Sequence, residues 1–367
     1  MTAGCERGAA MPPLEEAPPL SAFELWPQWL FYPPVLAWVL LLMLRHRSIR
    51  APLAANPSFP AGGLVGESKS AVLDLVRPEA RHWFAPHIAF DRSEAPAAED
   101  FVRAEKALAE AGLQLPLVAK PDLGCRGAGV RPVRDRHALL TYLDGFPAGA
   151  RLVLQQLVDW EGEAGIFWVR VPGEPRGRIV SLTLKYFPHV TGDGRLTLRQ
   201  LILADPRAGR IAPLYLVRHA DRLDRVVPAG QPLRLAFAGS HSRGAIFRDG
   251  THLVTPAMEA RFQQIASAIP EFWFGRFDVR FQCFTDLAAG TGFRILEVNG
   301  AGAEATHIWD SRMRLVDAYR SLFRQWGLAF AIGAANAGRG HRPEPLFTFL
   351  RRWWRERRLT PAYPGTQ

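Results

Sequence analysis

Lysine is scarce in this chain. Of its 45 basic residues only four are lysines, namely Lys69, Lys106, Lys120 and Lys185. Arginine therefore supplies almost every surface charge, and a lysine indicates a place that needs a compact ammonium group, as phosphate chemistry does. Lys120 and Lys185 each stand at the end of a predicted strand and are candidates for that role. The alternative is a strand-end lysine that only extends its charge into solvent.

Cysteine and the familiar catalytic signatures are scarce too. Cys5, Cys125 and Cys283 lie far apart, and an odd number at such spacing indicates a reducing compartment rather than a disulfide framework. The sequence has no Gly-x-Ser-x-Gly motif, no zinc-binding pattern and no Cys/His pair at a suggestive spacing. No side-chain nucleophile is therefore indicated.

Nucleic-acid-binding signatures are missing despite a basic balance. The formal net charge is 45 − 35 = +10, which by itself favours polyanions. However, the sequence shows no helix-turn-helix, zinc-finger or RNA-binding signature and no internal repeat. Much of the basic excess flanks an apolar segment near the N-terminus and a C-terminal tail. We therefore expect no nucleic-acid partner.

Two segments near the C-terminus predict a β-hairpin with a charged face. They read Gly-Arg-Phe-Asp-Val-Arg-Phe (275–281) and Ile-Leu-Glu-Val-Asn-Gly (295–300), joined by a short turn-like stretch. Period-two alternation separates the charged set Arg276, Asp278 and Arg280 from the apolar set Phe277, Val279 and Phe281. Pairing would gather the oxygen ligands Asp278, Glu297 and Asn299, a set that suits Mg²⁺. The alternative is a solvated charged face on an edge hairpin.

A second motif combines a strand-end lysine with a glycine-rich loop. The strand 115–120 ends in Val-Ala-Lys-Pro-Asp, and Gly-Cys-Arg-Gly-Ala-Gly-Val (124–130) follows. Glycines allow backbone N–H groups to approach phosphate oxygens, while Lys120 adds a point charge. The loop has neither the Gly-Lys-Ser/Thr of a Walker motif nor the order of a dinucleotide-binding fold. A plain turn between two strands explains the glycines equally well.

Taken together and in this order, the motifs resemble the ATP-grasp fold. The resemblance rests on Val-Ala-Lys-Pro with its glycine loop, the strand ending in Lys185, Arg-x-Asp-x-Arg and Leu-Glu-Val-Asn-Gly. The segment 190–202 (Val-Thr-Gly-Asp-Gly-Arg-Leu-Thr-Leu-Arg-Gln-Leu-Ile) is similar to a stretch in cyanophycin synthetases and bifunctional glutathione enzymes. The likeness covers about residues 101–330 and is greatest to carboxylate–amine ligases. It implies an α+β class, with two α+β subdomains clasping ATP.

The resemblance also implies roles for individual residues. Lys120 and Lys185 would contact the α- and β-phosphates, and the loop with Gly124, Gly127 and Gly129 would close over the β/γ end. The strand 152–158 would be the hinge, with Gln155, Gln156 and Val158 at the adenine, where the family usually has glutamate. Glu163, preferred over Glu161 because it opens the next strand, would bind the ribose. Mg²⁺ would be held by Asp278, Glu297 and Asn299, and Arg276 would stabilise the phosphorylated intermediate.

These roles imply a ligase that depends on ATP and Mg²⁺. A carboxylate would be activated as an acyl phosphate and then attacked by an amine or another nucleophile. The substrate would be a small-molecule or a peptide-like cell-envelope carboxylate. Two alternatives remain: an ATP-grasp phosphotransferase that phosphorylates a hydroxyl, and a nucleotide-binding protein with a degenerate site.

The acceptor side of the site is less defined by sequence. Ser240, His241, Ser242, Arg243 and the pair Arg218-His219 either line an acceptor pocket, with Arg243 clamping a carboxylate, or belong to a surface loop. The segment 299–307 departs from the Asn-x-x-Pro-Gly ending of D-alanine ligases. Dipeptide chemistry on D-alanine is therefore not expected.

The N-terminal region predicts association with a membrane. Residues 1–25, rich in Pro, Ala and Glu, are expected to be disordered. Residues 26–44 form an uncharged run that as a helix would reach roughly 28 Å. Trp26 and Trp29 suit an interfacial belt, Pro33-Pro34 would kink the helix, and basic residues follow the run. We expect a transmembrane or in-plane anchor with the catalytic part in the cytoplasm, against a buried helix as the alternative.

The remaining segments complete the expected organisation. Residues 45–100 would be a juxtamembrane, shortened N-terminal subdomain, whose loop 55–69 either binds an acidic group or only turns. Residues 101–335 would be the ATP-grasp domain. In the tail 336–367, aromatics and arginines alternate over 347–358, as in an interfacial helix on anionic lipid or a basic surface helix that packs its tryptophan pair.

Overall fold

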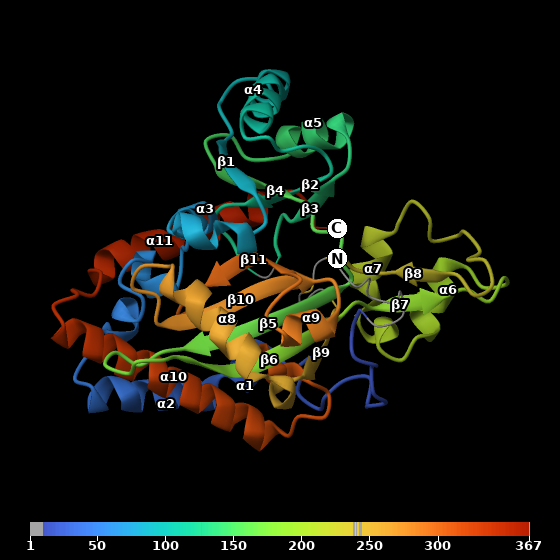
Figure 1. Ribbon diagram of the computed structural model, residues 1–367. Coiled ribbons are helices and arrows are strands. Elements are labelled where there is room, and N and C mark those ends of the chain that lie inside the picture. Colours follow the sequence, from blue (N-terminus) through green and yellow to red (C-terminus); the bar gives the residue numbers. More distant parts are fainter. Residues whose placement is uncertain (1–9, 126, 238, 240, 242–243, 367) are drawn as a thin grey trace.

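Two antiparallel sheets, each with its own helices, dominate the molecule (Figure 1). The computed structural model describes residues 10–366 except 126, 238, 240, 242 and 243. The first lobe has the sheet order β1-β4-β2-β3, and the second lobe has the order β11-β10-β5-β6-β9. The expected α+β class is confirmed in so far as the fold combines helices with antiparallel sheets, the third of which, β7-β8, has two strands.

The first lobe spans residues 87–156 and lies at the top of Figure 1. Its elements are β1 (His87–Asp91), α4 (Ala97–Glu110), β2 (Leu117–Pro121), β3 (Arg131–Val133), α5 (Arg136–Asp144) and β4 (Arg151–Gln156). Apolar residues of α4 and α5 pack on the sheet around Leu139 and Leu152, which are fully buried. Since β1 pairs with β4, the sheet starts at residue 87, inside the segment 45–100.

The second lobe is built on the predicted hairpin. Its strands are β5 (Gly162–Val169), β6 (Arg178–Tyr186), β9 (Ile246–Asp249), β10 (Phe274–Phe281) and β11 (Phe293–Asn299). β10 and β11 pair antiparallel with Asp278 opposite Glu297 and Arg276 opposite Asn299. The hairpin prediction is confirmed, although its connection contains a short helix, α9 (Phe284–Ala288), rather than a plain turn.

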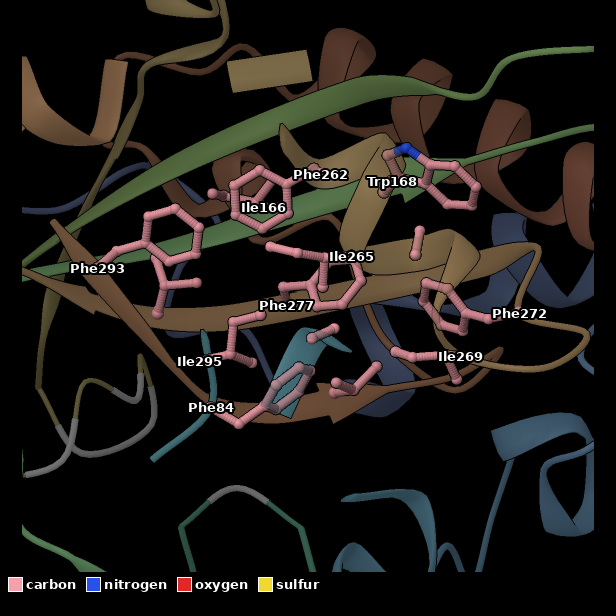
Figure 2. Close-up of a cluster of buried hydrophobic side chains, with 14 of the residues drawn as sticks. Phe84, Ile166, Trp168, Phe262, Ile265, Ile269, Phe272, Phe277, Phe293 and Ile295 are labelled. Atoms are coloured by element: carbon pink, nitrogen blue, oxygen red, sulfur yellow. The ribbon is translucent and has the colours of Figure 1, made fainter. Parts of the chain in front are cut away.

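Alternation along β10 separates a core face from a polar face. Phe277 lies against Phe262 and Ile265 of α8 (Pro256–Ser267), which covers one face of the sheet (Figure 2). Phe274 and Phe167 on the opposite face belong to the cluster that includes Ala329 and Ile332 of α10 (Leu315–Gly338). The same face carries the charged residues of β10 toward the first lobe.

A small third body follows β6 and lies at the right of Figure 1. It comprises β7 (His189–Thr191), α6 (Leu198–Ala204), α7 (Ala212–Arg218) and β8 (Pro232–Arg234). It contains much of the predicted segment 190–202. Asp193 accepts hydrogen bonds from two following backbone N–H groups, and Thr197 with Gln200 forms a capping box on α6. This segment therefore builds a turn and a helix start.

The N-terminal run does not form the single long helix that we expected. It divides at Tyr32 into α1 (Gln28–Phe31) and α2 (Pro33–Arg45), because a proline pair favours the first turn of a new helix. The 13 residues of α2 reach about 20 Å, short of a bilayer core of about 30 Å. Among the helices in the described part of the chain, none is both long and apolar enough to cross a membrane. The structure therefore does not support the predicted transmembrane span.

The preceding residues are also more ordered than predicted. Phe23 is buried and stacks on Phe31 at 5.6 Å between ring centroids. Buried Glu24 forms an ion pair with Arg207 at 2.5 Å. The predicted disorder of 1–25 therefore does not extend over residues 21–24, and residues 1–9 lie outside the described part.

The segments before and after the two lobes pack on the second lobe. The loop 55–69 leads into α3 (Lys69–Asp74), and Asn56 donates a hydrogen bond to the Phe274 carbonyl at 2.8 Å. After α10 the chain forms α11 (Leu346–Leu359), whose Glu356 accepts from the Gly66 N–H at 2.7 Å. The loop 55–69 and helix α11 thus meet beside the sheet that carries the charged hairpin.

Candidate active site

A cavity of about 1280 Å³ lies between the two lobes and gathers the predicted site residues. Its lining includes Lys120, Gly124, Gly127, Gln155, Gln156, Val158, Glu163, Lys185, Arg276, Asp278, Glu297 and Asn299. Of the predicted set only Gly129 is not part of the lining. A Cβ at Gly129 would meet the ring of Pro121 at 2.6 Å, so this glycine allows the loop to lie close to β2.

Asp278 is the centre of the charged network. Arg276 donates to both of its carboxylate oxygens, at 3.0 and 2.9 Å, and the Lys185 ammonium donates to one of them at 2.7 Å. The Asn299 amide donates to the second oxygen at 3.1 Å. Burial favours the neutral acid, but the charges of Arg276 and Lys185 outweigh it and hold the pKa of Asp278 well below its usual range. The carboxylate is therefore ionised at neutral pH.

A missing side chain on β5 makes room for this arrangement. Gly165 lies directly opposite Asp278 in the sheet. A Cβ at this position would stand 3.1 Å from Cδ of Arg276. Because the space above Gly165 is open, the Arg276 side chain can lie flat along the sheet and meet Asp278 with both of its donors.

Glu163 and Arg280 form a second charged pair beside the first. Arg280 donates to Glu163 at 2.9 Å, and the Lys185 ammonium lies 3.3 Å from the other oxygen of Glu163. Lys185 thus bridges Glu163 and Asp278. Both carboxylate oxygens of Glu163 therefore contact cationic side chains, whereas the neighbouring Glu161 is exposed.

Glu297 is paired with Lys69, which the sequence interpretation did not place in the site. The Lys69 ammonium lies 3.4 Å from Glu297 and donates to the Gly124 carbonyl at 2.6 Å. Glu67, two residues earlier, accepts from the Gly300 N–H at 2.9 Å, and burial raises its pKa to about 8. The loop 55–69 is therefore part of the site. The scarcity of lysine was the available signal, since Lys69, Lys120 and Lys185 all line the cavity and only Lys106 does not.

Lys120 is held by the hinge strand. Its ammonium donates to the side-chain oxygen of Gln155 at 2.9 Å and to the Leu296 carbonyl at 3.0 Å. The Gln155 amide nitrogen donates to the Ala85 carbonyl at 3.3 Å. Gln155 is therefore used in orienting Lys120, while Gln156 is less buried and lies next to Val158. Burial lowers the pKa of Lys120 to about 8.

This pKa predicts a pH-dependent affinity for ATP. Phosphate oxygens bind the ammonium form of Lys120, so the dissociation constant is expected to be flat below pH 7 and to rise above pH 8. The slope should approach about tenfold per pH unit, and Glu67, which ionises in the same range, adds to it. In Lys120→Arg the guanidinium stays charged, so the binding profile should be weaker in affinity and should keep only the shallower slope that Glu67 contributes. Calorimetric titrations between pH 6 and 9.5 test this; a flat wild-type profile would contradict it.

The C-terminal residues contact the glycine loop through hydrogen bonds. Tyr363 is buried in the first lobe and stacks on Phe146 at 5.4 Å. The Thr366 hydroxyl donates to the Gly127 carbonyl at 2.8 Å and accepts from the Gly129 N–H at 3.1 Å. The tail therefore ties the loop 124–130 to the core of the first lobe.

Removing one hydroxyl should loosen that loop. Thr366→Val removes both hydrogen bonds and is expected to weaken ATP binding about three- to tenfold, at about 1 kcal/mol or less per bond. Thr141→Val, which removes a hydroxyl on α5 that bonds only within its own helix, should leave ATP binding unchanged. Hydrogen exchange at 124–130 should rise in Thr366→Val alone. Equal affinities in the two variants would overturn the role of the tail.

The oxygen donors fit a hard divalent cation. Asp278 and Glu297 lie opposite one another, and the amide nitrogen of Asn299 is the atom that bonds Asp278, so its oxygen is available. Two carboxylates and one amide oxygen suit Mg²⁺, which completes its shell with water and phosphate. No cluster of three or more His, Cys, Asp or Glu side chains suited to a metal occurs among the described residues.

The structure places the predicted acceptor residues in different parts of the molecule. His241 lines the cavity, stacks on Trp309 at 4.7 Å and lies 3.0 Å from Glu24. Arg218 and His219 instead bond the Leu235 carbonyl inside the third body and are not part of the cavity lining. Ser240, Ser242 and Arg243 lie outside the described residues. Within 299–307, Ala301 to Glu304 line the cavity beyond Asn299.

Comparisons with known proteins give structural likeness only. No protein-family model and no curated protein matches the sequence. The chain is similar to a bifunctional glutathione synthetase from Pasteurella multocida, with 16% identity and a TM-score of 0.33 over 72% of this chain and 38% of that one. It is also similar to the D-cycloserine synthetase DcsG, with 14% identity and a TM-score of 0.37 over 71% of this chain and 70% of that one. TM-scores this low carry no weight beside the geometry of the cavity.

That geometry agrees with the sequence resemblance. Two lobes, each a sheet with helices, face one another across a single cavity. The lysine and glycine loop come from the first lobe, and Lys185, Arg276, Asp278, Glu297 and Asn299 come from neighbouring strands of the second. This two-lobed arrangement is the one that the resemblance to the ATP-grasp fold predicts.

Proposed function

We propose that this protein is an ATP-dependent ligase that joins a carboxylate to an amine. One observation supports this best: Asp278 is ionised between Arg276, Lys185 and Asn299, beside Glu297, in the cavity that also contains Lys120 and the glycine loop. A site with two carboxylates amid buried cations suits a metal–triphosphate complex, because each partner offsets the charge of the other.

The parts of ATP would then have defined neighbours. Lys120, Lys185 and the N–H groups of 124–130 would contact the phosphates, and Gln156 with Val158 would lie at the adenine. Asp278, Glu297 and Asn299 would hold Mg²⁺, which when bound offsets the charge of the β- and γ-phosphates. Glu163 would act on the nucleotide through the orientation of Lys185 and Arg280, with which it pairs.

The reaction requires positioning and charge compensation only. A carboxylate oxygen of the substrate attacks the γ-phosphorus, the bond to the β-phosphate oxygen breaks and ADP leaves. The amine nitrogen then attacks the carbonyl carbon of the acyl phosphate, the carbon–oxygen bond to phosphate breaks, and the nitrogen loses a proton. Arg276, which pairs with Asp278, would stabilise the charge on the transferred phosphoryl group.

Trapping with hydroxylamine tests this chemistry without knowledge of the natural amine. Wild-type protein is incubated with Mg²⁺, ATP, hydroxylamine and a panel of carboxylic acids. Stoichiometric ADP, free phosphate and hydroxamate that depend on the acid would support the ligase. ADP with a stable phosphorylated product and no free phosphate would instead support the phosphotransferase alternative. Mg²⁺-dependent ATP binding without turnover on the whole panel would favour a nucleotide-binding protein.

We also propose that the protein lies on the cytoplasmic surface of a membrane through α1 and α2. Support comes from side chains on these helices that are 57–75% exposed, namely Trp29, Leu36, Leu40, Leu41 and Leu44. Arg45, Arg47 and Arg50 follow them and suit anionic headgroups. Co-sedimentation with phosphatidylglycerol vesicles should fall strongly in Leu44→Glu, and retention equal to wild type would contradict the proposal.

A further inference from the structure

The cavity has more room than a nucleotide site requires. Its volume of about 1280 Å³ exceeds the range of about 300–1,000 Å³ that is usual for small-molecule sites. Beyond Asn299 the lining includes residues of α2 and α10. Tyr32, Val35, Leu36, Val39, Leu322 and Trp326 line this part, which we call the apolar arm.

A single carboxylate separates the apolar arm from the phosphate chemistry. Arg276 donates to the Glu304 carbonyl at 2.9 Å. The Glu304 carboxylate accepts from the Tyr32 hydroxyl at 2.9 Å and from the Trp309 indole at 2.8 Å. The arm therefore begins next to the arginine that would face the reacting carboxylate.

Polar groups deeper in the arm are satisfied by the protein. The Gln325 amide nitrogen donates to the Ala303 carbonyl at 2.5 Å, and its oxygen accepts from the Ala305 N–H at 2.9 Å. The remaining walls are largely the side chains of α2 and α10, which pack together in one hydrophobic cluster with Phe31 and Ile308. A polar acceptor would gain little from such walls, whereas an apolar chain would displace water from them.

The outer end of the arm opens on an apolar surface. Leu36 lines the cavity and is 61% exposed, and Leu40, one turn further along α2, is 60% exposed. A chain longer than the arm would therefore emerge beside Leu36, at the surface of α2. Both ends of the arm, the arginine inside and the leucines outside, match an amphiphilic molecule.

We infer that the carboxylate substrate is amphiphilic, with its carboxylate at Arg276 and an extended hydrocarbon chain in the arm that side chains of α2 and α10 line. This inference rests on the proposed ligase function for the placement of the carboxylate only. It defines the substrate class as acids with a linear apolar chain, and it makes α2 a part of the substrate site.

A chain-length series tests the inference directly. Butanoate, octanoate and dodecanoate, each below its micelle concentration, are titrated into the full-length protein by calorimetry. Affinity should rise about fourfold for each added methylene until the arm is full, the fold-change that one buried methylene gives. Equal affinity for butanoate and dodecanoate, or binding of none of the acids, would overturn the inference.

Two leucines on one helix provide a matched pair of variants. Leu36→Glu places a charge in the arm and should weaken dodecanoate binding at least tenfold while leaving butanoate unchanged. Leu40→Glu makes the same change at a position of equal exposure outside the cavity lining, and should bind both acids like wild type. Equal losses in the two variants would show adsorption on the surface of α2 and contradict the arm. Val39→Trp, which fills the arm without a charge, should also weaken dodecanoate alone.

Binding of ATP in the same preparations separates this inference from the proposed function. If Mg²⁺-dependent ATP binding is present but chain length has no effect, only the inference fails. If affinity rises with chain length but ATP does not bind, the arm stands and the ligase proposal fails.

Discussion

Replacing Asp278 with asparagine is expected to lower kcat/KM for ATP turnover by about 10³ or more. The change removes one of two metal-binding carboxylates and the anion that holds Arg276 with two hydrogen bonds and Lys185 with one. Asparagine keeps the shape of the side chain but has one neutral acceptor oxygen in place of the two charged carboxylate oxygens. The measurement is ADP release with the most active acid of the hydroxylamine panel, together with the ATP dissociation constant.

The same substitution should also destabilise the fold. Arg276 and Lys185 are largely buried, and removing the partner of a buried ion costs about 3–5 kcal/mol of unfolding free energy. Because the pKa of Asp278 is lowered in the folded state, its stabilisation is present above pH about 4 and is lost as pH falls toward the folded value. Thermal unfolding at pH 7 should therefore show a lower Tm for Asp278→Asn, and wild-type and variant curves should approach each other in acid.

An exposed acid nearby provides the control. Glu161→Gln makes the same chemical change at an exposed position and should leave ATP binding, turnover and Tm unchanged. Unchanged ATP affinity in Asp278→Asn, measured below its Tm, would show that the metal and phosphate site lies elsewhere.

Replacing Lys185 with methionine is expected to have the second-largest effect. The ammonium lies between Asp278 at 2.7 Å and Glu163 at 3.3 Å and is nearly inaccessible to solvent. Without the ammonium, the negative charges of Asp278 and Glu163 near the phosphates are less well neutralised. ATP affinity and kcat together should therefore fall about 10²- to 10³-fold. Lys185→Arg should not restore activity, because the larger planar group does not fit a buried site built for an ammonium.

Lys106→Met is the matched control for the lysines. Lys106 lies on α4 with 79% of its side chain exposed, and a surface pair of this kind contributes at most about 1 kcal/mol. Its replacement should leave ATP binding unchanged. A loss of affinity in Lys106→Met equal to that in Lys185→Met would mean that total charge, and not the position of the ammonium, governs binding.

The charged hairpin could be predicted because local alternation determines it. Along β10 the side chains at 276 and 278 must share a face once Phe277 is buried, and the structure confirms this for β10 and β11. The two lysines could also be placed from local sequence, because Lys120 ends an apolar run on β2 and Lys185 lies near the end of β6. These predictions needed no knowledge of contacts distant in sequence.

The parts that were missed depend on distant contacts. Glu67 bonds Gly300 across 233 residues and Gly66 bonds Glu356 across 290 residues, and no local pattern specifies such pairs. The prediction of a transmembrane span over residues 26–44 was not supported for a different reason. A run of leucines is compatible with a span, an in-plane helix or a helix half-covered by a neighbour, and only the packing of α2 on α10 decides among them.

Calorimetric titration of Mg-ATP into the full-length protein, with wild type beside Glu297→Ala and Glu161→Ala, tests the central claim most directly. The account predicts micromolar binding that requires Mg²⁺, is lost in Glu297→Ala and is retained in Glu161→Ala. Binding that survives Glu297→Ala, or that does not depend on Mg²⁺, would contradict the assignment of the cavity between the lobes as a metal–ATP site.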